Sequence, residues 1–464
     1  MKNTMGKLFG TDGIRGVANQ HPMTPEMALQ VGRAVADVFA GGKQAKIVIG
    51  RDTRISGPMI ESALVAGICS MGCDALLCGV MPTPAVAYLT TLMQAAAGLV
   101  VSASHNPYYD NGIKVFNGDG FKLSEGIEDR LEMIALDQKA AEQARSIKNT
   151  GRVDTISGAE QQYRKLLLQA LPQGMNFKGK TILMDCSNGA TYRVAPELFK
   201  ELGANVGPLF VKPDGKNIND GCGSQYPESL ARKVTEVAAD IGLAFDGDGD
   251  RLIAVDEKGE ILTGDQLLAV LAAYLKQNDS LKNNTVVSTV MSNMGLGTAL
   301  KDMNIKHVMA GVGDRYVVEE MKTHGAVLGG EDSGHTVLLD HHTTGDGMLT
   351  ALKLVEAMIY MDKPLSELKR IMTVFPQVLI SVDVKDKPEI DTLVEVTDEI
   401  EKIEKVALKL EKEIEEAKVF QVDLKNAILL LHDHVYWTKF FALLERNTLK
   451  DIYYKDGFSG AHED

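Results

Sequence analysis

The sequence is poor in aromatic residues and contains no long apolar run. Aromatic residues make up 6% of its 464 residues, with a single tryptophan, Trp437. No apolar run reaches the roughly 18 residues that a membrane-spanning helix needs, and Met1–Gly6 lacks the apolar region of a signal peptide. We therefore expect a cytoplasmic protein with no membrane partner.

Basic residues are fewer than acidic ones, and cysteines are few. The 49 basic and 63 acidic residues give a net charge of −14, which argues against nucleic acid as the main partner and still allows a small anionic substrate. The five cysteines lie mostly in apolar stretches, which is typical of buried thiols in a reducing compartment. A zinc site built from Cys69, Cys73 and Cys78 would lack a fourth ligand at a suitable spacing, so we do not expect one.

Apolar strands alternate with amphipathic helices along most of the chain. Strands are expected at 46–50, 97–101, 181–184, 243–245, 286–290 and 327–328, and helices at 24–40, 56–70, 159–171, 192–202, 267–276, 315–324 and 346–360. This alternation predicts doubly wound α/β domains with parallel or mixed sheets, whose ligand sites lie beyond the carboxyl ends of the strands. Residues 385–418 predict a charged amphipathic helix of about three heptads, and this pattern favours a helix that covers a sheet face over a coiled coil.

The 44 glycines are informative where they cluster in polar loops. Near the start, Gly10–Gly16 permits a tight backbone nest for an anion, and Arg15 supplies a bidentate phosphate donor. A plain turn is the alternative interpretation of this segment.

A second polar loop, Ser102–Pro107, follows an expected strand directly. It presents hydroxyl groups beside His105 and Asn106, which suits a nucleophile or a phosphate carrier as well as an ordinary capped turn. The Gly-x-Ser-x-Gly pattern of lipases is absent there. Lys114 places an amine nearby in the sequence.

The third loop carries Asp246, Asp248 and Asp250, followed by Arg251. Three carboxylates at alternate positions repel one another unless a divalent cation lies among them, so the loop predicts a metal site, with a solvated acidic turn as the alternative. An EF-hand is excluded, because Arg251 occupies the position that needs glycine and the flanks are expected strands. The adjacent arginine suits a site where metal and phosphate meet.

The fourth loop, Gly329–His335, follows another expected strand. Glu331 and Ser333 could hold sugar hydroxyls and His335 could move a proton, whereas an ordinary loop is the alternative. The stretch Gly174–Thr181 spells a Walker A motif, but it follows a helix and opens a strand. This order is the reverse of a true P-loop, so we do not expect nucleotide binding.

In combination and order, the four loops resemble those of the α-D-phosphohexomutase superfamily, from about Lys7 to about Val384. Ser102–Pro107 is similar to its phosphoserine loop, with Ser104 the phosphorylated residue, and the three aspartates are similar to its magnesium loop. Gly330–His335 is similar to its sugar-recognition loop. The spelling Gly-Glu-x-Ser-Gly-His, followed by Thr-Thr-Gly-Asp-Gly, is most similar to the phosphoglucosamine mutase branch.

The resemblance implies three consecutive doubly wound α/β domains and a smaller α+β domain at the end of the chain. Their expected bounds are 1–155 for the phosphoserine loop, 156–258 for the magnesium loop, 259–370 for the sugar-recognition loop, and 371–464 for the last domain.

The resemblance also implies a mechanism. Phosphorylated Ser104 would donate its phosphoryl group to glucosamine 6-phosphate and form a 1,6-bisphosphate. This intermediate would reorient in the site and return its 6-phosphoryl group to Ser104, leaving glucosamine 1-phosphate. One Mg²⁺ would be held by Ser104 and the three aspartates, with glucose or glucosamine 1,6-bisphosphate as activator. The implied roles are catalytic for Ser104, Lys114, Arg251 and His335, and substrate-binding for Arg15, His105, Asn106, Glu331 and Ser333. The product would serve amino-sugar nucleotide and cell-wall synthesis, and a homodimer is left open.

The sequence departs from the family after about Lys418. The last domain of the family carries an Arg-x-Ser-Gly-Thr-type loop that clamps phosphate, and no Ser-Gly-Thr occurs downstream of this point. Our hypothesis is that a frameshift or sequence substitution replaced this end, which translation of the coding DNA in the other two frames would test. Three alternatives therefore stay open: a phosphomannomutase/phosphoglucomutase, a catalytically impaired binding protein and a metal-dependent phosphatase.

Overall fold

The computed structural model describes residues 8–10, 12–41, 44–137 and 150–377, together with five isolated helical residues at 398, 401, 402, 405 and 409. The chain divides into two compact units, Met1–Gln377 and Val378–Asp464. The tail after Lys418, and most of the helix expected at 385–418, lie outside the described residues. Within the described part, no helix is both long enough and apolar enough to cross a membrane.

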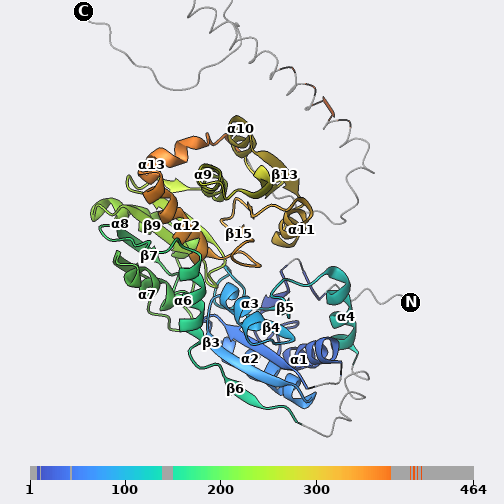
Figure 1. The fold of residues 1–464 in the computed structure, drawn as a ribbon. Helices are drawn as coiled ribbons and strands as arrows, with labels where there is room; N and C mark the ends of the chain where they lie inside the picture. Colours follow the sequence, from blue (N-terminus) through green and yellow to red (C-terminus); the bar gives the residue numbers. More distant parts are fainter. Residues whose placement is uncertain are drawn as a thin grey trace, which may run out of the picture. The chain divides into compact units, whose positions relative to one another are not determined.

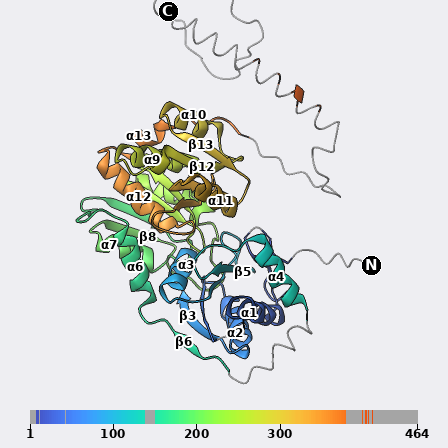
Figure 2. The same ribbon diagram turned by 45° about the vertical axis from the view of Figure 1, so that its right-hand side comes forward.

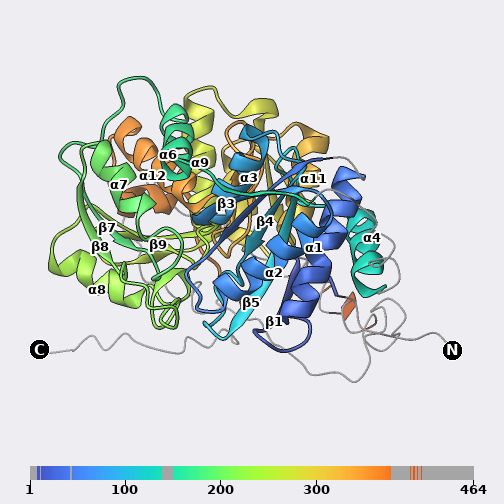
Figure 3. The ribbon, with the colours of Figure 1, turned by 90° about the horizontal axis from the view of Figure 1, so that it is seen from below.

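The first sheet has six strands in the order β1-β5-β4-β2-β3-β6. Its strands are β1 (Ile14–Val17), β2 (Lys46–Arg51), β3 (Asp74–Val80), β4 (Ala97–Val101), β5 (Asp110–Asn117) and β6 (Val153–Thr155), and its helices are α1 (Pro25–Ala40), α2 (Gly57–Ser70), α3 (Thr83–Leu92) and α4 (Glu125–Leu136). β5 runs antiparallel to β1 and β4, and the other pairs are parallel. The sheet is therefore mixed, and Figure 3 shows α1 and α2 lying over its strands.

Alternate residues of β2 bury into different cores, as the twofold period of a strand requires. Ile47 and Ile49 join the apolar cluster formed with α1, α2 and α4, whereas Val48 joins the cluster that contains α3. α1 begins where Thr24 accepts a hydrogen bond from the backbone N–H of Met27 at 3.2 Å, and ends at Gly41, whose φ of 55° is left-handed. These local signals explain why this helix was predicted almost to the residue.

The second sheet has five strands in the order β11-β10-β9-β7-β8. Its strands are β7 (Thr181–Asp185), β8 (Asn205–Leu209), β9 (Ile241–Phe245), β10 (Leu252–Asp256) and β11 (Ile261–Leu262), and its helices are α6 (Ala159–Gln169), α7 (Val194–Glu201) and α8 (Glu228–Glu236). Residue 258, an expected domain boundary, lies in the turn between β10 and β11, which pair with each other. The Walker A spelling lies between α6 and β7, the order that excluded a P-loop.

The third sheet has four strands in the order β13-β12-β14-β15. Its strands are β12 (Thr285–Thr289), β13 (Lys306–Ala310), β14 (Leu328–Gly330) and β15 (Thr336–Leu338), and its helices are α9 (Gly264–Gln277), α10 (Met294–Asp302), α11 (Asp314–His324), α12 (Gly347–Tyr360) and α13 (Leu365–Leu368). Figure 2 shows α9 to α12 around β12 and β13. Asp346 caps α12 by accepting from the backbone N–H groups of Met348 and Leu349.

One apolar cluster joins all three sheets. It contains Val86 of α3, Tyr163 of α6, Leu243 of β9, Leu271 of α9 and Leu352 of α12. Figure 1 shows the three α/β units one after another along the chain, from blue through green to orange, within residues 8–377. The shared core holds the loops after β4, β9 and β14 close together, which is where the sequence placed its polar motifs.

Candidate active site

Ser104 lies in the loop between β4 and β5 with a constrained backbone. Its φ is 51°, an uncommon conformation for a residue with a side chain. Its N–H donates to Oγ of Ser102 at 2.9 Å, and its own Oγ donates to Oδ2 of Asp246 at 2.5 Å. The Ser104 hydroxyl, which is 1% exposed, therefore faces the acidic loop of the second sheet.

Asp246, Asp248 and Asp250 lie between the antiparallel strands β9 and β10, as the exclusion of an EF-hand required. All three are buried, and one oxygen of each lies within 4.8 Å of the others. Oδ1 of Asp248 and Oδ1 of Asp250 have no hydrogen-bond partner. Burial and the charges of Asp250 and Asp248 raise the pKa of Asp246 well above its usual value. Unpartnered buried carboxylate oxygens at this spacing fit a divalent cation.

Lys114 of β5 reaches the same carboxylates. Its Nζ lies 2.8 Å from Oδ2 of Asp248, 2.9 Å from Oδ2 of Asp250 and 3.3 Å from Oδ2 of Asp12. Burial alone would lower the pKa of Lys114, but these carboxylates raise it well above its ordinary value. Conversely, burial would raise the pKa of Asp250, and the Lys114 charge holds it well below the usual range. Lys114 is therefore a buried ammonium group inside the site.

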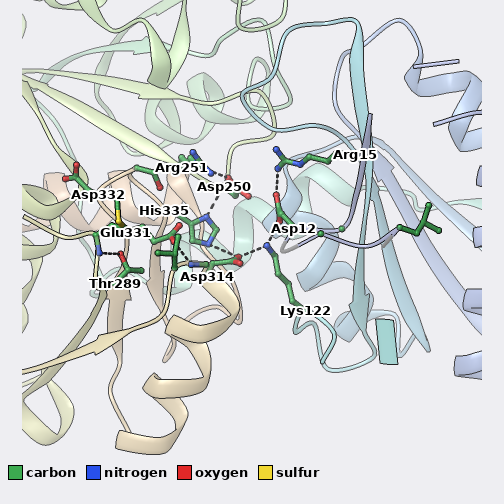
Figure 4. A pocket seen from close by; sticks show the side chains of 17 residues that line it. Asp12, Arg15, Lys122, Asp250, Arg251, Thr289, Asp314, Glu331, Asp332 and His335 are labelled. Atoms are coloured by element: carbon green, nitrogen blue, oxygen red, sulfur yellow. Dashed lines mark hydrogen bonds and ion pairs between the residues drawn. The ribbon is translucent and has the colours of Figure 1, made fainter. Parts of the chain in front are cut away.

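His335 lies between two carboxylates, as Figure 4 shows. Its Nδ1 lies 3.7 Å from Oδ1 of Asp250, and its Nε2 lies 3.3 Å from Oδ2 of Asp314. Burial would lower the pKa of His335, but the two carboxylates raise it to about 10. The two carboxylates thus favour the protonated imidazole at neutral pH.

The sequence analysis missed three charged residues of this site, which link segments of the first sheet to α11 beside the third sheet. Lys122 pairs with Oδ2 of Asp314 at 2.6 Å and also with Asp12, and Asp12 pairs with Arg15. Asp12 stands inside the Gly10–Gly16 motif and Asp314 follows a glycine at the start of α11, so both had weak local signals. Lys122 had none.

A cavity of about 620 Å³ opens beside these groups. Its lining residues are Leu8, Gly10, Asp12, Gly13, Arg15, Lys122, Asp250, Arg251, Thr289, Met291, Val312, Gly313, Asp314, Glu331, Asp332, Ser333 and His335. It therefore brings together the expected substrate-binding residues Arg15, Glu331 and Ser333 with the expected catalytic residues Arg251 and His335. The backbone N–H of Arg251 donates to Oδ1 of Asp246 at 3.2 Å.

The two remaining candidate residues belong to the Ser104 loop itself. Nδ1 of His105 lies 3.3 Å from Oγ of Ser104, and Nδ2 of Asn106 donates to Oδ2 of Asp110 at 2.9 Å. Burial, followed by the charges of Arg251 and Arg15, lowers the pKa of His105 to about 4. His105 is therefore neutral where His335 is charged.

Comparison with known proteins identifies the family. Three models match in succession: Phosphoglucomutase/phosphomannomutase, alpha/beta/alpha domain I at residues 6–142, domain II at 161–259 and domain III at 263–375. The phosphoglucosamine mutase of Syntrophus aciditrophicus is 55% identical over 401 residues, which cover 86% of this chain and 89% of that protein. The chain belongs to the phosphoglucosamine mutase family.

Another phosphoglucosamine mutase, from Syntrophobacter fumaroxidans, is 54% identical over 401 residues, with the same coverage of 86% and 89%. The family consists of phosphohexomutases, which are isomerases that act as intramolecular phosphotransferases. The three α/β domains and the family expected from the four loops are thus confirmed, whereas the smaller α+β domain expected at 371–464 lies mostly outside the described residues.

Solved structures agree with this assignment. A phosphoglucomutase/phosphomannomutase family protein from Burkholderia thailandensis superposes with a TM-score of 0.68 at 26% identity, covering 80% of each chain. The N-acetylphosphoglucosamine mutase of Aspergillus fumigatus, solved in complex with GlcNAc-6P and magnesium, superposes with a TM-score of 0.56 at 16% identity, covering 82% of each chain. The second likeness concerns the fold alone.

Proposed function

We propose that this phosphoglucosamine mutase family member interconverts glucosamine 6-phosphate and glucosamine 1-phosphate through phosphorylated Ser104 and a 1,6-bisphosphate. The observation that carries the proposal is the contact between Oγ of Ser104 and Oδ2 of Asp246 at 2.5 Å, close to a cavity of about 620 Å³ whose lining includes Arg15, Arg251 and Glu331. The names of the relatives, which are 50–55% identical, support this substrate class.

Some cationic groups of the site would bind the phosphate groups of the substrate, and others would transfer protons. Arg15 and Arg251 line the cavity and would bind the phosphate groups, because guanidinium groups match phosphate oxygens in pairs. Lys114 and His335 are both held in the protonated form, so either would donate a proton to the oxygen that loses its phosphoryl group and would be reprotonated by the hydroxyl group that attacks. Glu331 and Ser333 would hold the sugar hydroxyls, and His105 and Asn106 would shape the loop that carries Ser104.

The acidic cluster would hold one Mg²⁺, with Ser104, Asp246, Asp248 and Asp250 as the protein ligands. Hard oxygen ligands and the unpartnered oxygens of Asp248 and Asp250 fit this ion. When bound, the ion would neutralise negative charge on the transferring phosphoryl group. Within the described part of the chain, Lys114 supplies the compensating charge for these carboxylates.

The wider role follows from the reaction. The product would feed amino-sugar nucleotide and cell-wall synthesis in the cytoplasm, with glucose or glucosamine 1,6-bisphosphate keeping Ser104 phosphorylated. We also propose a division into three α/β domains, with the boundary between the second and the third after β11, which pairs in the second sheet, and not at residue 258. All five cysteines are buried free thiols, which agrees with a reducing compartment.

A second candidate is a catalytically impaired relative. It is favoured by one observation, the lack of a Ser-Gly-Thr triplet after Lys418, where the family carries its phosphate clamp. A clamp of several charged hydrogen bonds contributes about 1.5–3 kcal/mol for each bond, so its loss would weaken substrate binding strongly.

A coupled assay separates these candidates. Formation of glucosamine 1-phosphate from glucosamine 6-phosphate is measured with Mg²⁺ and glucose 1,6-bisphosphate, for the natural protein and for Ser104→Ala, alongside the glucose and mannose phosphates. We expect the highest kcat/KM on the glucosamine phosphate and no turnover by Ser104→Ala. Equal activity in both proteins would sink the mechanism, and higher rates on mannose or glucose phosphates would favour the phosphomannomutase/phosphoglucomutase alternative. Phosphorylated Ser104 without turnover would favour the impaired relative.

A further inference from the structure

Arg54 is a fully buried arginine outside the groups assigned above. It follows β2, at the start of the segment that leads into α2, and it is the bulkiest fully buried side chain in the described part of the chain. A buried guanidinium group is costly unless its charge and all of its N–H groups find partners. Its partners therefore indicate what the residue is for.

Every N–H group of the Arg54 guanidinium has an acceptor, and most of these acceptors belong to the Ser104 loop. Nε donates to Oδ2 of Asp52 at 2.9 Å. Nη2 donates to the carbonyl oxygens of Ser104 at 3.0 Å and Asn106 at 2.8 Å. Nη1 donates to the carbonyl oxygen of Asp110 at 3.1 Å and also to that of Pro107. A single planar group thus binds four backbone carbonyls between residues 104 and 110.

The ion pair between Arg54 and Asp52 also fixes the backbone N–H of Ser104, through the side chain of Ser102. Oδ2 of Asp52, the partner of Arg54, accepts from Oγ of Ser102 at 2.7 Å, and that Oγ in turn accepts from the Ser104 N–H at 2.9 Å. Both the N–H and the C=O of Ser104 are therefore fixed by one buried pair. This arrangement accounts for the left-handed φ of 51° at a residue that is not glycine.

A residue from the second sheet's loops completes the arrangement. Nδ2 of Asn219 donates to the carbonyl oxygen of Ser104 at 2.9 Å and to that of Asn106 at 3.0 Å. The same two carbonyls thus receive hydrogen bonds from Arg54 on one side and from Asn219 on the other. The loop is held against the acidic cluster from two parts of the chain that are far apart in sequence.

We propose that Arg54 is a positioning residue for phosphoryl transfer, whose guanidinium fork sets the Ser104 loop so that Oγ faces Asp246. The proposal rests on the proposed function for its catalytic consequence, but the loop geometry it describes is independent of activity. A point charge alone cannot make these contacts, because an ammonium group has three donors and no fixed plane. Arg54→Lys should therefore keep the ion pair with Asp52 and lose most of the hydrogen bonds to the four loop carbonyls.

The test compares Arg54→Lys with Arg51→Lys. Arg51 is a matched control from the same segment. Its Nε pairs with Oδ2 of Glu61 at 3.2 Å and its Nη1 donates to the carbonyl oxygen of Asp52 at 3.4 Å, whereas the four carbonyls of the Ser104 loop accept from Arg54. Circular dichroism checks folding, hydrogen–deuterium exchange follows the peptide that contains residues 102–110, and kcat and KM are measured for glucosamine 6-phosphate. Arg54→Ala is assayed with added guanidinium ion or methylammonium ion.

We expect Arg54→Lys to fold, to exchange faster in the 102–110 peptide, and to lose kcat by roughly 100-fold with KM changed less than about threefold. Guanidinium, but not methylammonium, should raise the kcat of Arg54→Ala. Arg51→Lys should match the natural protein in all of these measurements.

Unchanged exchange at 102–110 in folded Arg54→Lys would overturn the proposal whatever the activity. An unchanged kcat would overturn it as well. If Arg54→Lys fails to fold, the guanidinium rescue of Arg54→Ala decides, and equal rescue by both cations, or none, counts against the proposal. If the natural protein shows no mutase turnover but Arg54→Lys still exchanges faster at 102–110, the proposed function is rejected. The proposal that Arg54 positions the Ser104 loop then stands.

Discussion

Gly247, between the first two aspartates of the acidic loop, is packed directly against the Ser104 loop. A Cβ at this position would lie 2.6 Å from the carbonyl oxygen of Ser104 and 2.8 Å from Nδ2 of Asn219. Ordinary contact begins at 3.4 Å, so Gly247→Ala would force the two loops apart by 3.4 − 2.6 = 0.8 Å. This is a third of the present 2.5 Å separation between Oγ of Ser104 and Oδ2 of Asp246.

We expect Gly247→Ala to fold and to lose kcat by about 100-fold, because a displacement near 1 Å in reacting groups costs about that much. The assay is the coupled mutase reaction, with circular dichroism as the check on folding. Gly126→Ala is the matched control: Gly126 is exposed within α4, and a Cβ there meets no atom within 4 Å. Its activity should be unchanged. A folded Gly247→Ala protein with the kcat of the natural protein would refute the idea that close contact between these loops sets the rate.

Three further outcomes follow from the charges of the site and of the second sheet. Lys114→Met should lower the free energy of unfolding by about 3–5 kcal/mol in a chelator, because it leaves the buried carboxylate of Asp248 without its cationic partner. Urea denaturation should show a smaller loss with Mg²⁺, and equal losses would count against the site. Asp248→Asn should weaken Mg²⁺ binding in calorimetry by about 100-fold or more, and unchanged affinity would remove this residue as a ligand. Burial raises the pKa of Asp185 to about 6 from 3.8, so the folded protein holds this proton more tightly and rising pH between these values lowers stability by about 3 kcal/mol. Asp185→Asn should flatten that part of the pH profile of unfolding, and an identical profile would show that this carboxyl is not responsible.

The parts of the site that follow strands could be predicted from the sequence. The Ser104 loop, the three aspartates and His335 each come directly after an apolar run, and the sheets place these loop ends together. Loop chemistry is local, because glycine, serine and carboxylates within a few residues already indicate a phosphate or metal site. The family resemblance then gave the roles that we propose for these residues.

The residues that hold the site together could not be found in this way. Arg54 appeared only as part of a charged turn, and Asn219 gave no signal, because their partners lie 50 to 115 residues away in the sequence. Lys122 and Asp314 form their pair across 192 positions for the same reason. Only the folded chain brings such groups into contact.

Several strands were not predicted, among them the apolar strands β3 and β10 as well as strands with a more polar sequence. β5 begins with an Asp-Asn-Gly turn signal, yet most of the strand is buried, and Lys114 tolerates this burial because it pairs with carboxylates of the acidic loop. β8 contains a glycine and a proline and has no buried residue, so its pattern resembles a loop. By contrast, β2 is apolar between its two charged ends and β4 contains no polar side chain, and both were predicted to within one residue.

The most direct test follows the phosphoryl group on Ser104. The protein is labelled with radioactive phosphate at Ser104, freed of excess label, and mixed with unlabelled glucosamine 6-phosphate and Mg²⁺ while product formation is measured. We expect the label to leave the protein at the rate of the first turnover and to appear in the bisphosphate and in glucosamine 1-phosphate. Product formation with the label still bound to Ser104 would contradict a mechanism in which this serine carries the transferred group.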